Sequence, residues 1–414
     1  MLEQIEGSLG VAKAVALCRP GVVCAYPISP QTHIVENVGK FVKNGTLKDC
    51  DFLNVESEFS AISVAIGSEV GGARTYTATA SQGLLYMTEG VYSASGLGLP
   101  IVMTVASRAI GGPINIWNDH SDSLSQRDSG WLQLFCESNQ DAVDTHIMAF
   151  KIAEEVGLPV MVCMDGFVLT HAFERLDIPS QETVDKFLPE YQPREYLTPK
   201  EPVSIGAMVG PEAFTEVRFL QQRKMAKALK VIEKVTKEYR DLTGSKSGGL
   251  LDCYNCENAD LKLVIMGSTV GTAKDEIDRL KAEGINVGII SLKSFRPFPY
   301  EAMAKAIGDT KKVICLERAF SFGARGIVCP EVKRAMESKN CDVKTVVAGL
   351  GGRPIFGTTI RGIVKDALAD KFTEEFTWFD VNADVLNSYT DKTEGVTFKN
   401  GPIAQSVLEN SVKD

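Results

Sequence analysis

Val22-Val23-Cys24-Ala25-Tyr26-Pro27-Ile28-Ser29-Pro30-Gln31-Thr32 reads as an apolar strand, a turn fixed by two prolines, and the start of a helix. Ser29 lies between the prolines, so its hydroxyl and nearby backbone N–H groups precede the helix. Such an arrangement can bind an anion, for example a carboxylate. We therefore expect a strand–turn–helix unit with an anion site at the carboxyl end of the strand.

A second segment, Val55-Glu56-Ser57-Glu58-Phe59-Ser60-Ala61, opens an Ala- and Gly-rich helix. A carboxylate that faced inward here, among apolar neighbours, could exchange a proton with a ligand. On the residues alone, the plainer interpretation is that Glu56 and Glu58 are helix N-terminal charges that complement the helix dipole.

Apolar strands alternate with helical stretches twice along the chain. Short apolar strands separated by helices predict a parallel sheet that is covered on both faces. We expect an α/β fold of two doubly wound parallel-sheet domains. The first domain spans 1–242, with an irregular, helical extension from about 172, and a linker at 243–259 leads to the second domain at 260–375. A C-terminal tail follows at 376–414; its acidic part, from about 390, is expected to be extended and to wrap a partner subunit. The strands expected in the first domain are Val22–Pro27, Asp51–Asn54, Arg74–Thr79, Pro100–Val105 and Pro159–Asp165.

Composition narrows the class of protein. The 414 residues carry a net charge of -9 without a prominent basic stretch, which argues against nucleic acid as a partner. The acidic start, Met1-Leu2-Glu3-Gln4-Ile5-Glu6, does not fit a signal peptide. No apolar run approaches the ~20 residues that a membrane span needs. The expected location is the cytoplasm.

The 10 cysteines are expected to be mostly small buried hydrophobic residues in a reducing compartment. Only Cys253 and Cys256 form a C-x-x-C pair, whereas iron–sulfur and zinc sites usually need four ligands. We assign neither a cluster nor a metal ligand to this chain.

Several motifs, in order, resemble those of the alpha subunit of the 2-oxoacid:ferredoxin oxidoreductases, the pyruvate and 2-oxoisovalerate synthase family. The resemblance covers roughly residues 5–370. Beside the two segments above, it rests on Thr77–Leu84, Ser107–Ala109, Asn115–Ser123, Gln126–Trp131, Phe295–Pro299 and Phe320–Gly323. It implies a thiamine pyrimidine-binding domain followed by a domain like the C-terminal domain of transketolase.

The resemblance assigns the main catalytic role to Glu58. Thiamine diphosphate must lose its C2 proton, and the base is the cofactor's own amino group in its imino form. A glutamate beside the pyrimidine N1′ drives that tautomer by sharing a proton. Family likeness maps this glutamate onto Glu58, and Glu56 stays structural.

The resemblance also implies the surroundings of the substrate. Ser29 stands where pyruvate enzymes usually carry threonine and would bind the substrate carboxylate, which Arg108 would neutralise. Gly111 and Gly112 replace the bulkier residues of pyruvate enzymes, so a branched or aromatic 2-oxo acid remains possible. The remaining implied residues are Tyr26, Pro27 and Gln82 at the cofactor and Asn115, Asp119 and His120 in a loop over the site.

One absence bears on partners. Stand-alone thiamine enzymes carry a Gly-Asp-Gly motif that holds Mg²⁺ and the diphosphate, and this chain has none. A beta subunit would therefore supply the diphosphate and Mg²⁺ half of the cofactor site. Iron–sulfur and gamma-type subunits would carry the clusters, in a dimer of hetero-oligomers, with coenzyme A as co-substrate.

The leading hypothesis is a subunit that decarboxylates a 2-oxo acid, most simply pyruvate, to acyl-CoA and CO₂, and passes electrons to ferredoxin or a similar acceptor. The same chemistry on 2-oxoisovalerate or phenylglyoxylate is the alternative. An electron-transfer protein, a non-catalytic structural subunit and a transferase of the transketolase type fit the cysteine spacing and the motifs less well.

Overall fold

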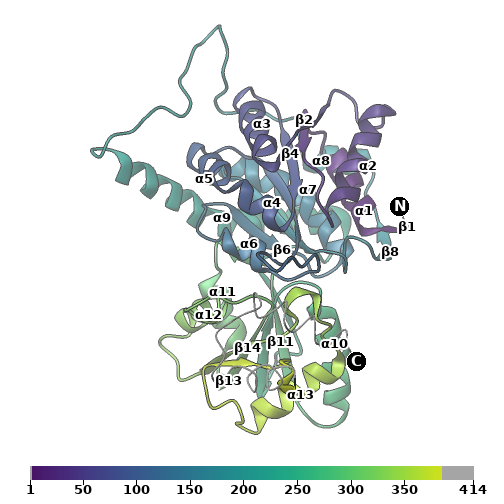
Figure 1. Ribbon diagram of the computed structural model, residues 1–414, viewed down its shortest axis with the longest axis vertical. Coiled ribbons are helices and arrows are strands. Elements are labelled where there is room, and N and C mark those ends of the chain that lie inside the picture. The colour runs from purple at the N-terminus through teal and green to yellow at the C-terminus, as the bar shows by residue number, and fades with distance from the viewer. Residues whose placement is uncertain (1, 385–414) are drawn as a thin grey trace, which may run out of the picture.

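A seven-stranded sheet, in the order β12-β6-β7-β5-β4-β2-β3, forms the centre of the N-terminal lobe in this computed structural model, which describes residues 2–384 (Figure 1). Its strands run parallel except β12, which pairs antiparallel with β6. The predicted α/β class is confirmed. The strands are β2 (Val22–Ala25), β3 (Asp51–Asn54), β4 (Thr75–Thr79), β5 (Val102–Ser107), β6 (Leu132–Phe135), β7 (Val160–Asp165) and β12 (Ser294–Arg296).

Helices cover both faces of this sheet, because successive side chains of a buried strand point to opposite faces. In β7, Val160 and Val162 join one hydrophobic core, whereas Met161 and Cys163 join another. The first core is built with α1 (Gly7–Leu17), α2 (Thr32–Lys43) and α7 (Asn139–Val156), and the second with α3 (Glu58–Val70), α4 (Ser81–Tyr86) and α5 (Thr88–Leu97).

A six-stranded sheet, in the order β15-β14-β13-β10-β11-β9, forms the second lobe. It is parallel except for the edge strand β9. Its strands are β9 (Leu251–Tyr254), β10 (Leu261–Ile265), β11 (Val287–Leu292), β13 (Lys312–Glu317), β14 (Asp342–Val347) and β15 (Phe376–Trp378), and its helices are α10 (Thr269–Ala282), α11 (Tyr300–Ile307), α12 (Cys329–Ala335) and α13 (Gly357–Leu368).

Two strands of this second sheet fall outside the segment 260–375. Strand β9 lies within the expected linker 243–259, and β15 begins at the first residue of the expected tail. Both are edge strands of only a few residues, so neither has the length or the pattern that marks a strand in the sequence. The rest of that tail, from residue 385 on, lies outside the described residues.

The two lobes share a hydrophobic core. Trp131 and Phe135 of the first lobe belong to the same buried cluster as Phe295 and Phe298. The rings of Phe135 and Phe295 meet edge to face with centroids 6.5 Å apart. Because β12 carries Phe295 into the first sheet, the second half of the chain completes the first lobe.

The segment 172–259 is built around one long helix. It begins with β8 (Phe173–Asp177), which pairs antiparallel with β1 (Leu2–Glu6), and α8 (Gln181–Phe187). The N-terminal end of helix α9 (Phe214–Thr243) and the segment that precedes it extend away from the N-terminal lobe (Figure 1), whereas Ala228, Ile232 and Val235 of the same helix join the hydrophobic core of that lobe. None of the described helices is both long enough and apolar enough to cross a membrane.

Candidate active site

The residues singled out in the sequence gather at the carboxyl edge of the first sheet. Strand β2 lies between β3 and β4, so the order of the chain reverses at β2. Open α/β sheets bind ligands outside the carboxyl ends of their strands at such a switch point. The Tyr26–Pro30 turn follows β2, Glu58 follows β3, Gln82 and Gly83 follow β4, and Arg108 follows β5.

Glu58 is a buried carboxylate without a hydrogen-bond partner among residues 2–384. Ser57 caps α3 by accepting a hydrogen bond from Ser60 N at 3.2 Å, which places Glu58 in the first turn. Its side chain is 8% exposed, and no other described residue hydrogen-bonds its carboxylate. Glu56, in contrast, is exposed and accepts a hydrogen bond from the Ser60 hydroxyl, which lowers its pKa. The two acids therefore have different surroundings, and only Glu58 is buried with its hydrogen-bonding capacity unused.

Gly83 leaves the space that the Glu58 carboxylate occupies. A Cβ atom at position 83 would lie 2.7 Å from Glu58 Oε1 and 2.6 Å from Thr79 Oγ1. The Thr79 hydroxyl is also buried without a partner among the described residues. The Glu58 carboxylate and the Thr79 hydroxyl therefore lie together beside Gly83 and could both bind the polar nitrogens of a ring.

We expect Gly83→Ala to displace the Glu58 carboxylate and reduce turnover by about 10²-fold, because a misplacement of about 1 Å at a catalytic group costs that much. Steady-state kinetics of the assembled enzyme would measure it. Gly67→Ala in α3 is the matched control, since a Cβ there meets open space and alanine favours a helix. An unchanged rate in Gly83→Ala would show that the carboxylate need not hold this position.

Arg108 is held at the site by the residues predicted to accompany it. Its Nη1 donates to Ser29 O at 2.8 Å, its Nε to Asn115 O at 3.3 Å, and its Nη2 to Gln82 Oε1 at 3.4 Å. The side chain is buried. Burial lowers the pKa of Arg108, although the Asp122 carboxylate raises it. An arginine has five N–H donors, so two remain for an incoming carboxylate.

Asp122 fixes the backbone around Arg108. Its Oδ2 accepts hydrogen bonds from Ser81 N and Arg108 N, both at 2.9 Å, and its Oδ1 accepts one from Ser123 N at 2.6 Å. Burial raises the pKa of Asp122 to about 7, although these three N–H groups lower it. Asp122 thus joins the ends of β4 and β5, a positioning role that its place in a polar loop does not reveal.

The other predicted residues lie at the edge of this group. Tyr26, Pro27 and Ser29 are exposed on the turn, and Gln82 Nε2 donates to Gly111 O at 3.3 Å. Gly111 and Gly112 are exposed, and a Cβ at either would meet nothing within 4 Å. Side chains at these two positions would therefore extend into solvent beside Gln82.

Asn115, Asp119 and His120, predicted in a loop over the site, are tied to residues far away in the sequence. Asn115 Nδ2 donates to Gly351 O at 3.1 Å, and Asp119 Oδ2 accepts from Gly351 N at 3.0 Å, so both contact the second lobe. His120 is 2% exposed, and its Nε2 lies 2.8 Å from Asp165 Oδ1. The Asn115 and Asp119 side chains hold the loop against the second lobe, whereas the His120 side chain bonds the first lobe and its backbone N–H donates to Arg318 O at 2.9 Å.

Asp165, at the end of β7, is the centre of that contact. Its Oδ2 accepts from Arg318 Nη1 at 2.8 Å and from Ser268 N at 2.9 Å. Although burial raises it, the charges of Arg318 and His120 bring the pKa of Asp165 well below its usual range. Asp165 ends an apolar strand and Arg318 follows another. Because 153 residues separate them, the sequence does not indicate that they form an ion pair.

Comparison with known proteins follows the same division of the chain. Residues 13–237 match the family model described as pyruvate flavodoxin/ferredoxin oxidoreductase, thiamine diphosphate-binding, and residues 259–360 match that of pyruvate:ferredoxin oxidoreductase core domain II. The chain is 44% identical over 367 residues to the pyruvate synthase subunit PorA of Methanosarcina barkeri, covering 87% of this chain and 91% of that one. It is 38% identical over 382 residues to the ketoisovalerate oxidoreductase subunit VorA of Pyrococcus horikoshii, covering 91% and 97%.

Solved structures agree on the fold. A 2-oxoglutarate:ferredoxin oxidoreductase from Magnetococcus marinus superposes with a TM-score of 0.65 at 21% identity, over 89% of this chain and 65% of that one. A split-gene transketolase gives a TM-score of 0.53 at 14% identity, over 89% and 99%. The family match over more than half of the chain and the 44% identity to a curated relative place the chain in the pyruvate flavodoxin/ferredoxin oxidoreductase family of oxidoreductases.

Proposed function

We propose that this chain is the alpha subunit of a thiamine diphosphate-dependent enzyme that oxidatively decarboxylates a 2-oxo acid, most simply pyruvate, to acyl-CoA and CO₂, with ferredoxin or a similar protein as electron acceptor. The observation that carries the proposal is the unpartnered Glu58 carboxylate, buried at the switch point of the sheet. Relatives named as pyruvate synthase and ketoisovalerate oxidoreductase subunits support the substrate class.

The surroundings of Glu58 fit the pyrimidine half of the cofactor. Thiamine diphosphate, when bound, supplies the nucleophilic carbon that attacks the 2-oxo group. Glu58 would share a proton with N1′ of the aminopyrimidine, and its burial would keep water from competing for that proton. The absence of a side chain at Gly83 lets the Glu58 carboxylate and the Thr79 hydroxyl lie together at the start of α4, where both could face the ring.

Arg108 and Ser29 would bind the substrate carboxylate beside the cofactor. Three backbone or amide oxygens already orient the Arg108 guanidinium, so its two free N–H groups are preorganised. The exposed Ser29 hydroxyl adds a neutral donor on the neighbouring turn. A bulkier substrate such as 2-oxoisovalerate could extend into the open space at Gly111 and Gly112, which keeps it as the alternative.

We expect Arg108→Lys to raise KM for the 2-oxo acid about 10- to 100-fold and to change kcat less, because a charge-assisted hydrogen bond contributes about 1.5–3 kcal/mol. Lysine keeps the charge but not the planar donor set. Arg127→Lys, in the same loop, is the control, since its guanidinium donates to Leu124 O. A KM equal to that of the unmodified enzyme would remove Arg108 from substrate binding.

Partner subunits are part of the proposal. Large apolar side chains are exposed on the same segments that carry the site, as expected of an interface; they are Tyr26, Leu85, Tyr86, Ile114 and Trp117. A beta subunit docked there would supply the diphosphate and Mg²⁺ half of the cofactor site.

A second exposed apolar surface lies on and just before α9. It is formed by Met208, Phe219 and Leu220 and could contact iron–sulfur, gamma-type or symmetry-related subunits.

We also propose that the complex works in the cytoplasm and that residues 1–242 and 260–375 act as its two functional domains. All ten cysteines are free thiols, which fits a reducing compartment. Hydrogen bonds join the two domains: Ser268 N donates to Asp165, and Gly351 N donates to Asp119 in the loop that follows Arg108.

The decisive experiment isolates the native complex through this chain and follows CoA-dependent viologen reduction with pyruvate, 2-oxoisovalerate, 2-oxoglutarate and phenylglyoxylate. Pyruvate is expected to react fastest. Preference for a branched or aromatic acid would favour the alternative, and no reaction in a complex that retains thiamine diphosphate and its clusters would contradict the proposed class.

A further inference from the structure

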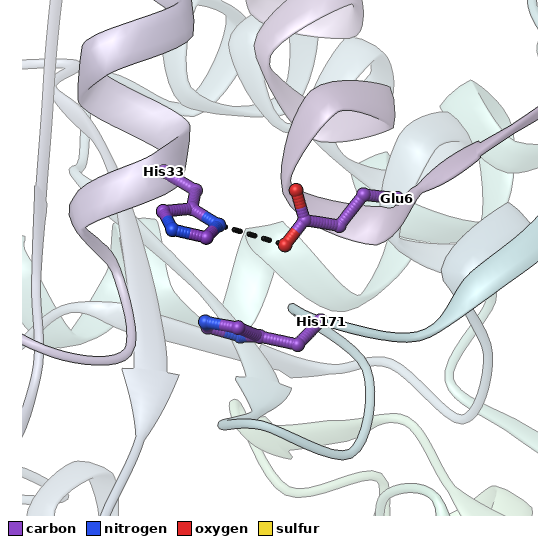
Figure 2. Close-up of side chains that lie close together, drawn as sticks. All are labelled: Glu6, His33 and His171. Carbon is purple, nitrogen blue, oxygen red and sulfur yellow. Dashed lines mark hydrogen bonds and ion pairs between the residues drawn. The ribbon is translucent and has the colours of Figure 1, made fainter.

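Three side chains capable of binding a metal meet at the junction of β1, α2 and the loop between β7 and β8. Glu6 closes β1, His33 lies in the first turn of α2, and His171 lies in the loop (Figure 2). One nitrogen of each histidine and one carboxylate oxygen all lie within 4.8 Å of one another. No part of the proposed oxidoreductase chemistry uses these residues.

We propose that Glu6, His33 and His171 bind a divalent transition-metal ion of the Zn²⁺ class. Two imidazoles and one carboxylate are ligands that Zn²⁺ prefers, and a water molecule completes a tetrahedral set. Bonds of about 2.0–2.1 Å place tetrahedral ligands about 3.4 Å apart. Separations of up to 4.8 Å must therefore close, and the 2.7 Å hydrogen bond between His33 and Glu6 must be replaced by bonds to the ion. The His33 side chain is 46% exposed and Glu6 17%, so the site is open to solvent. His33 Nδ1 and Glu6 Oε1 already lie 2.7 Å apart, in the hydrogen bond drawn in Figure 2.

His171 is held in the orientation that a ligand needs. Its Nδ1 lies 2.7 Å from the buried Thr170 hydroxyl, which also accepts a hydrogen bond from Phe167 N at 2.8 Å. When Nδ1–H donates to that hydroxyl, the lone pair is on Nε2, for which no described residue provides a hydrogen bond. Ligating histidines commonly have their other nitrogen fixed by such an outer partner.

Thr170 in turn is tied to the start of α1. Its carbonyl oxygen accepts hydrogen bonds from Ser8 N at 2.9 Å and Ser8 Oγ at 2.7 Å. Ser8 lies two residues after Glu6, so the loop and the carboxylate keep a fixed relation. His33, on α2, is the residue of the three that these hydrogen bonds do not link to the others. Its ring lies 4.7 Å from that of His171, centroid to centroid.

Zinc titration of the full chain tests the site. The background carries Cys253→Ser and Cys256→Ser, because that thiol pair is a competing zinc ligand. After treatment with a chelator, calorimetry with ZnCl₂ should give one ion per chain. The other two of the four histidines, His120 and His146, are buried and cannot substitute.

Variants locate the ion. His33→Ala, a helix-surface change, and His171→Ala should each abolish saturable binding, and Thr170→Val should weaken it about 10- to 100-fold through loss of the outer partner. Glu36→Ala, an exposed acid on α2, should bind as the background does. Circular dichroism checks the fold of each variant. The site would be overturned if the background bound no zinc, or if His33→Ala and His171→Ala bound zinc as tightly as the background does.

Cobalt substitution gives an independent readout. Co²⁺ bound by two imidazoles and a carboxylate should show visible d–d bands without a sulfur-to-cobalt charge-transfer band, and His33→Ala should remove them. In the background that lacks Cys253 and Cys256, absence of these bands, or bands that persist in His33→Ala, would refute the proposal.

Discussion

Glu58→Gln is expected to lower turnover by about 10²–10⁴-fold, the range that positioned proton transfer contributes to catalysis. Glutamine keeps the size of the side chain and can still accept a hydrogen bond, but it cannot share a proton with the pyrimidine ring. Because no described residue bonds the Glu58 carboxylate, the amide disturbs no existing contact, so the fold and the assembly should survive. CoA-dependent viologen reduction, with gel filtration and thiamine diphosphate content, measures both effects.

Glu56→Gln is the matched control for this prediction. Glu56 lies two residues earlier, is exposed, and bonds the Ser60 hydroxyl, so its substitution should leave turnover unchanged. The contrast separates a catalytic carboxylate from a helix N-terminal charge, the two interpretations that the sequence left open. Equal activity in Glu58→Gln and the unmodified enzyme would remove the catalytic role, and equal loss in both variants would assign the effect to helix α3.

The strands that bear the candidate site are visible in sequence because they are short, apolar and followed by unusual turns. Cys24 and Ala25 lead into a turn with two prolines, and no helix can continue through that pattern. The proposed role of Glu58, in contrast, depends on the burial of its side chain. The sequence does not show which of the two acids, Glu56 or Glu58, is buried, because their neighbours in the chain are similar. Only the fold shows that Glu58 is enclosed while Glu56 faces solvent.

Contacts between the lobes are what sequence reasoning misses. Strand β6 (Leu132–Phe135) follows a long polar loop, and its neighbour β12 has three residues from the other half of the chain. Neither has the length or the alternation that marks a strand. The side-chain partner of His120 is also hidden in the sequence, because Asp165 is 45 residues away and in turn bonds Arg318 of the second lobe.

Asp165→Asn should cost about 3–5 kcal/mol of unfolding free energy, the cost of removing one member of a buried ion pair. The carboxylate accepts from Arg318, Ser268 and His120, and an amide offers one oxygen and places N–H groups against the remaining donors. Arg318 is 6% exposed and would be left as an unpaired buried cation. Urea unfolding should show the loss, and Asp309→Asn, a fully exposed acid, should show almost none.

The pH dependence of the stability of Asp165→Asn distinguishes the contribution of the ion pair from that of packing. The folded pKa of Asp165 is lowered, so its contribution is present above the ordinary pKa of an aspartate and is lost as pH falls toward the folded value. The difference in stability between the unmodified chain and Asp165→Asn should therefore be constant at neutral pH and shrink as pH falls below about 4. A difference that does not change with pH would mean that packing, not the ion pair, joins the two lobes. Arg318→Gln added to Asp165→Asn should recover part of the loss, because the unpaired cation is then gone.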